Sequence, residues 1–155
     1  MPRPTKALKA RRAASPRRAA KVIRMRMPSS RTAVAPMIER ILDAVQDARL
    51  DQEQQDNLAV AVAEALSNAA LHGNKLAPRR VVRVSVELPP SGGAVVEVTD
   101  SGHGFDAATV SDPTDPARVL MPGGRGVFLM RRLVDNLEYN AAGNTVRLTV
   151  NPPRK

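Results

Sequence analysis

Two neighbouring segments alternate between apolar and polar residues, and they constrain the fold of this chain more than any other feature. Residues 81–88 read VVRVSVEL and residues 94–99 read AVVEVT, which is the period-two pattern of half-buried β-strands. Residues 89–93 between them, PPSGG, are typical of a turn. We therefore predict an antiparallel β-hairpin in the middle of the chain.

The segment before this hairpin carries a strand pattern and a helical pattern. Residues 22–27 alternate like a strand, and residues 28–30 end it and offer a helix N-cap. A first helix is expected over residues 32–49. Its expected apolar face consists of Val34, Met37, Ile38, Ile41, Leu42 and Val45.

A second helix is expected to begin after Asp51, a suitable N-cap with Gln54 three residues later to close a capping box. The helix should end near residues 72–74, where Gly73 can adopt the left-handed conformation of a C-cap. Its expected apolar face consists of Leu58, Val60, Val62, Leu66 and Ala69.

The C-terminal part of the chain predicts an irregular segment, a helix and a second hairpin. Residues 107–122 hold several prolines and few periodic apolar residues, so we expect an irregular flap there. Residues 127–134 form a short amphipathic pattern. Residues 136–140 and 145–150 predict a closing hairpin.

Composition limits the class of protein. A chain of 155 residues fits one domain, and with 2% aromatic residues its core must be aliphatic. The absence of cysteine excludes disulfides, thiolate metal sites and a cysteine nucleophile, and it fits a cytoplasmic protein. No apolar run approaches the roughly 18–20 residues that cross a bilayer, so no membrane association is expected.

The positive charge is concentrated at the N-terminus. Eight of the nine net positive charges fall within residues 1–21, which we expect to be a disordered basic arm preceding a domain over residues 22–151. The arm is either a solvated tail or a weak attractor of nucleic acid or an acidic partner. The near-neutral domain with few aromatics argues against stacking or base-specific recognition of nucleic acid.

Three polar residues follow one another at helical spacing in the second helix. Glu64, Asn68 and His72 are four residues apart each time, so they are expected to share one helical face. Such groups are costly to bury unless they are paired or bind a ligand. The stripe is therefore either a solvent-exposed polar edge or part of a binding site.

Two glycine-rich segments supply possible ligand contacts. After the second strand of the hairpin, Asp100-x-Gly102-x-Gly104 is either an ordinary turn or a site where a carboxylate accepts a hydrogen bond from an exocyclic amine such as that of adenine. Residues 123–126, GGRG, open a helix, where free N–H groups favour phosphate and Arg125 could add a charged contact. The alternative for this second segment is a flexible hinge.

Together these segments suggest a nucleotide site. With adenine at Asp100 and phosphates at residues 123–126, the Asn68 amide oxygen could ligate Mg²⁺. Glu64, one turn earlier, could accept a proton from the attacking hydroxyl during transfer of the γ-phosphoryl group.

The same three segments resemble the N, G1 and G2 boxes of the GHKL ATPases, the histidine-kinase-like ATPase domains of gyrase, histidine kinases and mismatch-repair proteins. The matching patterns are ExxxNxxxHG at residues 64–73, DxGxGFD at residues 100–106 and GxGVFLMxxLxD at residues 124–135. The short flap and the run GRGVFLM look most like the branch of anti-sigma-factor serine/threonine kinases. The resemblance covers about residues 22–150.

This resemblance implies an α/β fold, a two-layer sandwich in which helices back a mixed, mostly antiparallel sheet. It also implies ATP and Mg²⁺ as cofactors, with Glu64 as the catalytic base and Asn68 as the metal ligand. The residues that it implies for ATP binding are Asn68, His72, Asn74, Asp100, Gly102, Gly104, Gly124, Arg125, Gly126 and Val127.

The resembling kinases bind a sigma factor and phosphorylate a serine or threonine of an anti-anti-sigma partner with the STAS fold, and some are homodimers. They often carry an arginine early in the first helix to hold these partners, where this chain has residues 36–38, PMI, flanked by Arg31 and Arg40. The alternative function is a non-catalytic regulator that holds its partner in a nucleotide-dependent way. A histidine autokinase is not expected, because nothing before residue 22 could form dimerisation helices.

Overall fold

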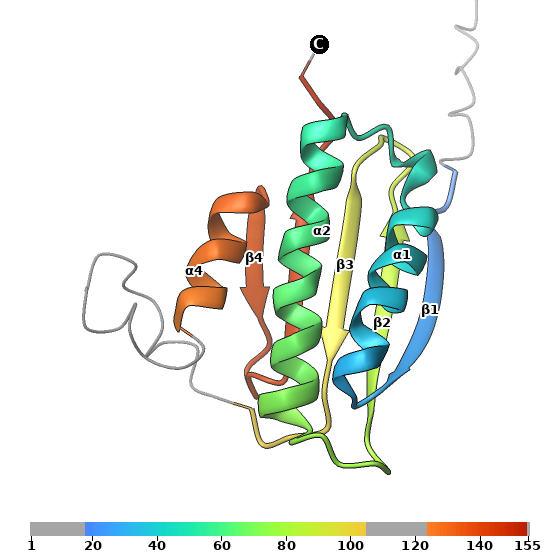
Figure 1. Ribbon diagram of the computed structural model, residues 1–155. Helices are drawn as coiled ribbons and strands as arrows, with labels where there is room; N and C mark the ends of the chain where they lie inside the picture. The colour runs from blue at the N-terminus through green and yellow to red at the C-terminus, as the bar shows by residue number, and fades with distance from the viewer. Residues whose placement is uncertain (1–17, 105–123, 155) are drawn as a thin grey trace, which may run out of the picture.

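The computed structural model describes residues 18–104 and 124–154, which form a sheet covered on one face by helices (Figure 1). The strand order is β1-β2-β3-β5-β4, and every pairing among the described strands is antiparallel. The strands are β1 (Lys21–Pro28), β2 (Val81–Leu88), β3 (Ala94–Thr99), β4 (Asn136–Tyr139) and β5 (Thr145–Val150). The expected two-layer α/β fold and both expected hairpins are confirmed.

The helical layer lies on one side only. Its helices are α1 (Val34–Ala44), α2 (Gln52–Ser67) and α4 (Gly124–Leu133), and the short turns are η1 (Arg31–Ala33), η2 (Gln46–Ala48) and η3 (Asn68–Gly73). Helix α2 runs along the middle of the sheet, between α1 and α4 (Figure 1). The expected basic arm up to residue 17 and the expected flap at residues 107–122 lie outside the described residues.

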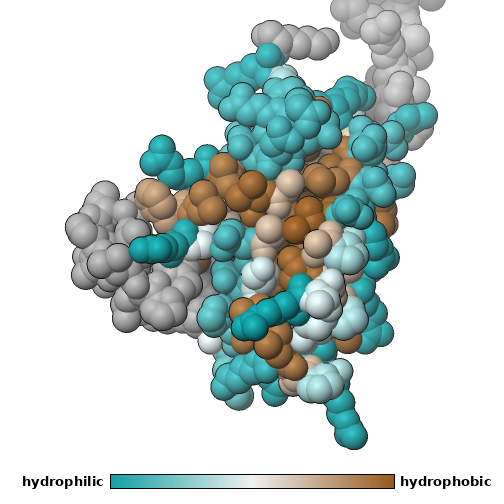
Figure 2. All heavy atoms as spheres, in the orientation of Figure 1, coloured by the Kyte–Doolittle hydropathy of each residue, from teal (hydrophilic) through white to brown (hydrophobic). Residues whose placement is uncertain are grey.

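The core between the layers is aliphatic, as the composition requires. Alternate residues of β2, among them Val82, Val84 and Val86, face the helices and are buried. Helix α2 supplies Leu58 and Leu66, both fully buried. On the helical face apolar side chains gather mainly in the middle, and hydrophilic ones lie toward the rim (Figure 2). Burial of a leucine or valine side chain stabilises a fold by roughly 1.5–3 kcal/mol.

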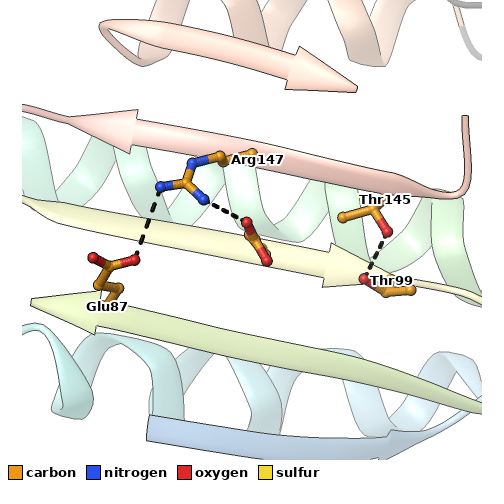
Figure 3. Close-up of polar contacts among 5 residues, drawn as sticks. Glu87, Thr99, Thr145 and Arg147 are labelled. Carbon is orange, nitrogen blue, oxygen red and sulfur yellow. Dashed lines mark hydrogen bonds and ion pairs between the residues drawn. The ribbon is translucent and has the colours of Figure 1, made fainter. Parts of the chain in front are cut away.

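The opposite face of the sheet carries polar side chains (Figure 3). Arg147 of β5 forms an ion pair with Glu97 of β3, at 2.6 Å, and a second with Glu87 of β2, at 3.8 Å. Thr99 and Thr145 are hydrogen-bonded at 2.8 Å. Because these groups are partly exposed, each ion pair contributes about 1 kcal/mol or less, and their main effect is to fix the register of three strands.

The capping box at the start of α2 is confirmed in both halves. The Asp51 carboxylate accepts a hydrogen bond from the Gln54 backbone N–H at 2.8 Å, and the Gln54 side chain accepts one from the Asp51 N–H at 3.2 Å. The Gln54 amide also donates to the carbonyl of Asn151 at 2.9 Å. Gln54, which the capping-box pattern predicts as a partner of Asp51, thus also binds the C-terminal segment to the start of the helix.

Two expectations about the helices were wrong. Helix α1 ends at Ala44 rather than residue 49, because a 3-10 turn and a left-handed Arg49 (φ 58°) redirect the chain into α2. The connection between β2 and β3 holds this turn in place, because the Gly93 N–H donates to the Ala48 carbonyl at 2.8 Å. Val60, expected on the apolar face of α2, is 46% exposed, because it lies off the face that packs on the sheet.

The single tyrosine of the chain offers a direct test of the packing around β4. Burial raises the pKa of Tyr139 to about 12, and the positive charge of Arg131 only partly opposes this rise. We expect tyrosinate absorbance to titrate near pH 12 in the folded protein and near pH 10 in denaturant. Since the folded-state value is the higher one, the free energy of unfolding should fall as pH rises from 10 toward 12. A folded-state midpoint near 10 would contradict this packing.

No helix in the described ranges is long and apolar enough to cross a membrane.

Candidate functional site

The site begins where α2 changes its helical geometry. The α-helix ends at Ser67, and residues 68–73 continue as one π-helical segment, η3. In a π-helix the hydrogen bond spans five residues rather than four. Glu64 and Asn68 lie half-buried before or at this change, whereas His72 lies beyond it and is exposed. Of the three residues, His72 is therefore the one most open to solvent.

Glu64 and Asn68 face the beginning of α4. A Cβ atom built on Gly126 would lie 2.8 Å from the Glu64 Oε2 atom and 3.2 Å from the Asn68 Nδ2 atom. The backbone of Gly126 therefore packs directly against both side chains, which come from the C-terminal end of α2, about 60 residues earlier in the sequence. Neither side chain makes a hydrogen bond to another described residue, so both are available to a ligand.

The N-terminal turn of α4 lies at this point. The helix begins at Gly124, so the N–H groups of Gly124, Arg125 and Gly126 lack a partner within the helix. These groups and the positive end of the helix dipole favour an anion. Arg125 is exposed, so its side chain can reach a ligand, whereas the Val127 side chain is buried in the core.

Asp100 is packed against the end of η3. A Cβ atom on Gly73 would collide with the Asp100 carboxylate, and one on Gly102 would collide with the Gly73 carbonyl. The Asp100 Oδ1 atom accepts a hydrogen bond from the Gly102 N–H at 2.7 Å. Gly73 was expected to be a left-handed C-cap, which was wrong: the left-handed residues are Lys75 and Leu76, and Gly73 is needed because a side chain would displace Asp100.

The electrostatics of Asp100 are set by its partial burial. Burial raises the pKa of the Asp100 carboxyl above its ordinary value, while the Gly102 N–H and the positive charge of Arg80 oppose the rise. A carboxylate that is partly removed from water gains more from a hydrogen-bond donor on a ligand than an exposed one does.

The turn after Asp100 rests on the β4–β5 hairpin. The Asp100 N–H donates to the Asn144 carbonyl at 2.9 Å. Gly104, at φ 75°, lies so close to the Ala142 carbonyl that a Cβ atom could not fit. The closing hairpin therefore supports this turn, a role that the sequence did not indicate because the contacts join segments about 40 residues apart.

Asn74 was expected among the residues that bind ATP, but the structure places it beneath the surface. It is fully buried, and its side-chain atoms are hydrogen-bonded to Ser29 and Ser101. Direct contact with a ligand is therefore not available to it. Ser29, expected to offer a helix cap, instead donates to the Arg80 carbonyl at 2.7 Å.

The described residues thus form two linked groups. Glu64, Asn68 and Gly126 make the first, Gly73, Asp100 and Gly102 make the second, and the π-helical segment η3 connects them. The first group offers a carboxylate, an amide and free N–H groups, which suit Mg²⁺ and phosphate. The second offers a half-buried carboxylate packed against two glycines at positions where no side chain would fit. Both donor sets fit a nucleotide.

Comparison with known proteins agrees with this geometry. The sequence model of the family described as "Histidine kinase-like ATPase domain" matches residues 27–150. The chain is 30% identical over 110 residues to an anti-sigma F factor of Clostridium botulinum strain Eklund 17B / Type B, covering 70% of this chain and 71% of the relative. It is 29% identical, with the same coverage, to the anti-sigma F factor of strain Alaska E43 / Type E3.

A solved structure has the same fold. The crystal structure of the RsbU and RsbW domains of Rv1364c from Mycobacterium tuberculosis superposes with a TM-score of 0.59 at 16% sequence identity. The match covers 87% of this chain but only 33% of that chain, so this protein spans one third of the larger molecule. At this identity the likeness concerns the fold alone.

Proposed function

Because this chain belongs to the family of histidine kinase-like ATPase domains, we propose that it binds ATP with Mg²⁺ and transfers phosphate to a serine or threonine of a partner protein. The observation that carries the proposal is the closure of Gly126 on Glu64 and Asn68, which brings a helix N-terminus to a carboxylate and an amide. A solvent-exposed polar edge would not require a glycine to face it.

Asp100 would bind adenine through a hydrogen bond to its carboxylate. The Asp100 carboxylate has one oxygen engaged by the Gly102 N–H, which leaves its other acceptor positions for the exocyclic amine of adenine. Gly73 and Gly102 have no room for side chains, so the carboxylate packs directly against the backbone and is held in one place for the base. His72 and Gly104 would lie near the bound base. Asn74 is buried and would act only indirectly, through its hydrogen bond to Ser101.

The phosphates would lie at the start of α4. The N–H groups of Gly124, Arg125 and Gly126 would donate to phosphate oxygens, the Arg125 side chain would add a charged contact, and Val127 would anchor this turn in the core. Asn68 would supply the single protein ligand to Mg²⁺, which would neutralise charge on the phosphates. Glu64 would accept the proton of the attacking hydroxyl, since its carboxylate lies beside Asn68 and Gly126.

The proposed partners are a sigma factor and an anti-anti-sigma protein of the STAS fold, as in the kinases that the sequence resembles. Support comes from the relatives named anti-sigma F factor. We propose that two exposed arginines hold these partners: Arg31, in the turn before α1, and Arg40, within α1. Such partners imply a cytoplasmic site of action.

Binding of a fluorescent ATP analogue tests the nucleotide site. We expect micromolar binding to the wild type that is strengthened by Mg²⁺ and reduced at least tenfold in Asp100→Asn, because the amide offers a donor where adenine also offers one. Binding that is equal in both proteins would remove Asp100 from the site. Absence of binding to the wild type would overturn the proposed function.

Asp100→Asn should also raise the stability of the nucleotide-free protein slightly. The folded-state pKa of Asp100 lies above the ordinary 3.8, so ionisation of this group lowers the free energy of unfolding as pH rises through that window. Asparagine removes this cost at neutral pH. We expect a slight rise in Tm at pH 7, which shrinks as the pH approaches 4. A fall in Tm at pH 7 would show that the ionised carboxylate stabilises the fold.

A further inference from the structure

Asn74 is a fully buried polar residue in a chain whose core is otherwise aliphatic. Its exposed fraction is 0%, and among the described residues only Ser29 is also polar and buried. Burying an amide is costly unless every donor and acceptor is satisfied. A residue kept in such a position is therefore expected to hold specific groups together.

The Asn74 side chain joins two segments that are far apart in the sequence. Its Oδ1 atom accepts a hydrogen bond from the Ser101 N–H at 2.8 Å. Its Nδ2 atom donates to the Ser29 Oγ atom at 2.8 Å, and Ser29 in turn donates to the Arg80 carbonyl at 2.7 Å. One amide thus ties the turn after β3 to the corner after β1.

The backbone of Asn74 is fixed as well. Its N–H donates to the Ala69 carbonyl at 2.8 Å, and its carbonyl accepts from the Ala77 N–H at 3.0 Å. The side chain therefore has a rigid base at the end of η3, directly after Gly73, which lies against the Asp100 carboxylate.

The bond to Ser101 acts on the middle of the turn that carries Asp100. Ser101 lies between Asp100 and Gly102, and the Asp100 carboxylate accepts from the Gly102 N–H at 2.7 Å. On the other side, the Asp100 N–H donates to Asn144 at 2.9 Å. Asn144 holds the start of the turn and Asn74 holds its next residue, so the direction of the carboxylate depends on both.

We propose that Asn74 is a positioning residue that sets the selectivity of the site for adenine, by fixing the turn from which Asp100 presents its carboxylate. The inference rests on the proposed function, because it assumes that Asp100 contacts the base. Without the Asn74 amide oxygen, the Ser101 N–H is unpaired, the turn can relax, and Asp100 no longer meets the exocyclic amine at one fixed angle.

The experiment compares the affinities of ATP and inosine triphosphate, which lacks the exocyclic amine. We expect the wild type to prefer ATP by about tenfold or more, and Asn74→Ala to lose most of this preference. Ser29→Ala is the matched control, because it removes a bond from the same buried network but leaves the bond between Asn74 and Ser101. It should lower Tm and keep the preference for ATP.

A second measurement does not need the nucleotide. Hydrogen exchange of the Ser101 amide in the free protein should be at least about tenfold faster in Asn74→Ala than in Ser29→Ala. If Asn74→Ala does not fold, Asn74→Ser leaves a smaller cavity and has a hydroxyl too short to reach both partners, so it serves in both measurements.

The outcomes separate the two proposals. A wild type that does not bind ATP overturns the proposed function and this inference together. A wild type that prefers ATP, with an equal preference in Asn74→Ala, overturns the inference alone. Equal loss of preference in Asn74→Ala and Ser29→Ala also overturns it, because the effect would then follow general loss of packing rather than the bond to Ser101.

Discussion

Replacing Glu64 by glutamine is expected to reduce phosphate transfer to a serine or threonine acceptor by about 10²–10⁴-fold, while ATP affinity changes less than about threefold. Glutamine keeps the size of the side chain and its place beside Gly126, but its amide cannot take a proton from the attacking hydroxyl. The measurement is a single-turnover transfer assay with the cognate acceptor, together with binding of the fluorescent ATP analogue.

Glu53→Gln is the control for this substitution. Glu53 lies in the first turn of the same helix, is exposed, and is far along α2 from Asn68. The same chemical change there should leave both transfer and binding intact. Undiminished transfer by Glu64→Gln would remove Glu64 as the base. If the wild type binds ATP and a sigma factor but transfers no phosphate, the non-catalytic regulator is the correct function.

The elements that the sequence predicted well are those determined by neighbours along the chain. Alternation alone is enough to identify β2 and β3, because each strand has one face on the core and the turn between them is short. The capping box of Asp51 and Gln54 is likewise a contact over three residues. Local patterns of this kind do not depend on contacts with distant segments.

The elements that the sequence missed depend on contacts between distant segments. The π-helical segment η3 puts Gly73 against Asp100, and nothing in the helix itself requires this geometry. Helix α1 ends early because the turn after it bonds to Gly93 of the β2–β3 connection. Val60 has the apolar character of a core residue, but its side of α2 has no partner layer.

The candidate site also has features that follow from local sequence patterns and features that depend on contacts between distant segments. The spacing of Glu64 and Asn68 follows from helix geometry, so their proximity could be predicted, whereas the π-helical geometry of η3 and the exposure of His72 could not. The support given to the Asp100 turn by Asn74 and Asn144 could not be predicted, because both contacts cross between elements. The residues proposed to touch the ligand could therefore be identified from the sequence, whereas the residues that hold them in place could not.

Gly126→Ala is expected to separate activity from stability. Alanine favours a helix over glycine by up to about 1 kcal/mol, so α4 should not be weakened. The new Cβ atom would lie 2.8 Å from the Glu64 Oε2 atom, which is the end of a flexible side chain and can turn away at low cost. A displacement of about 1 Å at a reacting group can lower the rate by about 10²-fold. We therefore expect kcat to fall by about 10²-fold with Tm unchanged within about 2 °C.

A double substitution shows whether this loss passes through Glu64. If Gly126→Ala acts by moving the Glu64 carboxylate, it should add less than about threefold to the loss already caused by Glu64→Gln, because the displaced group no longer acts as a base. Fully additive losses would mean that the methyl group acts elsewhere, on Asn68 (3.2 Å from the Cβ position) or on the N–H groups that face the phosphates. A large fall in Tm would instead show that the close approach of α4 to α2 cannot accept even one methyl group, and that Gly126 is required by the fold.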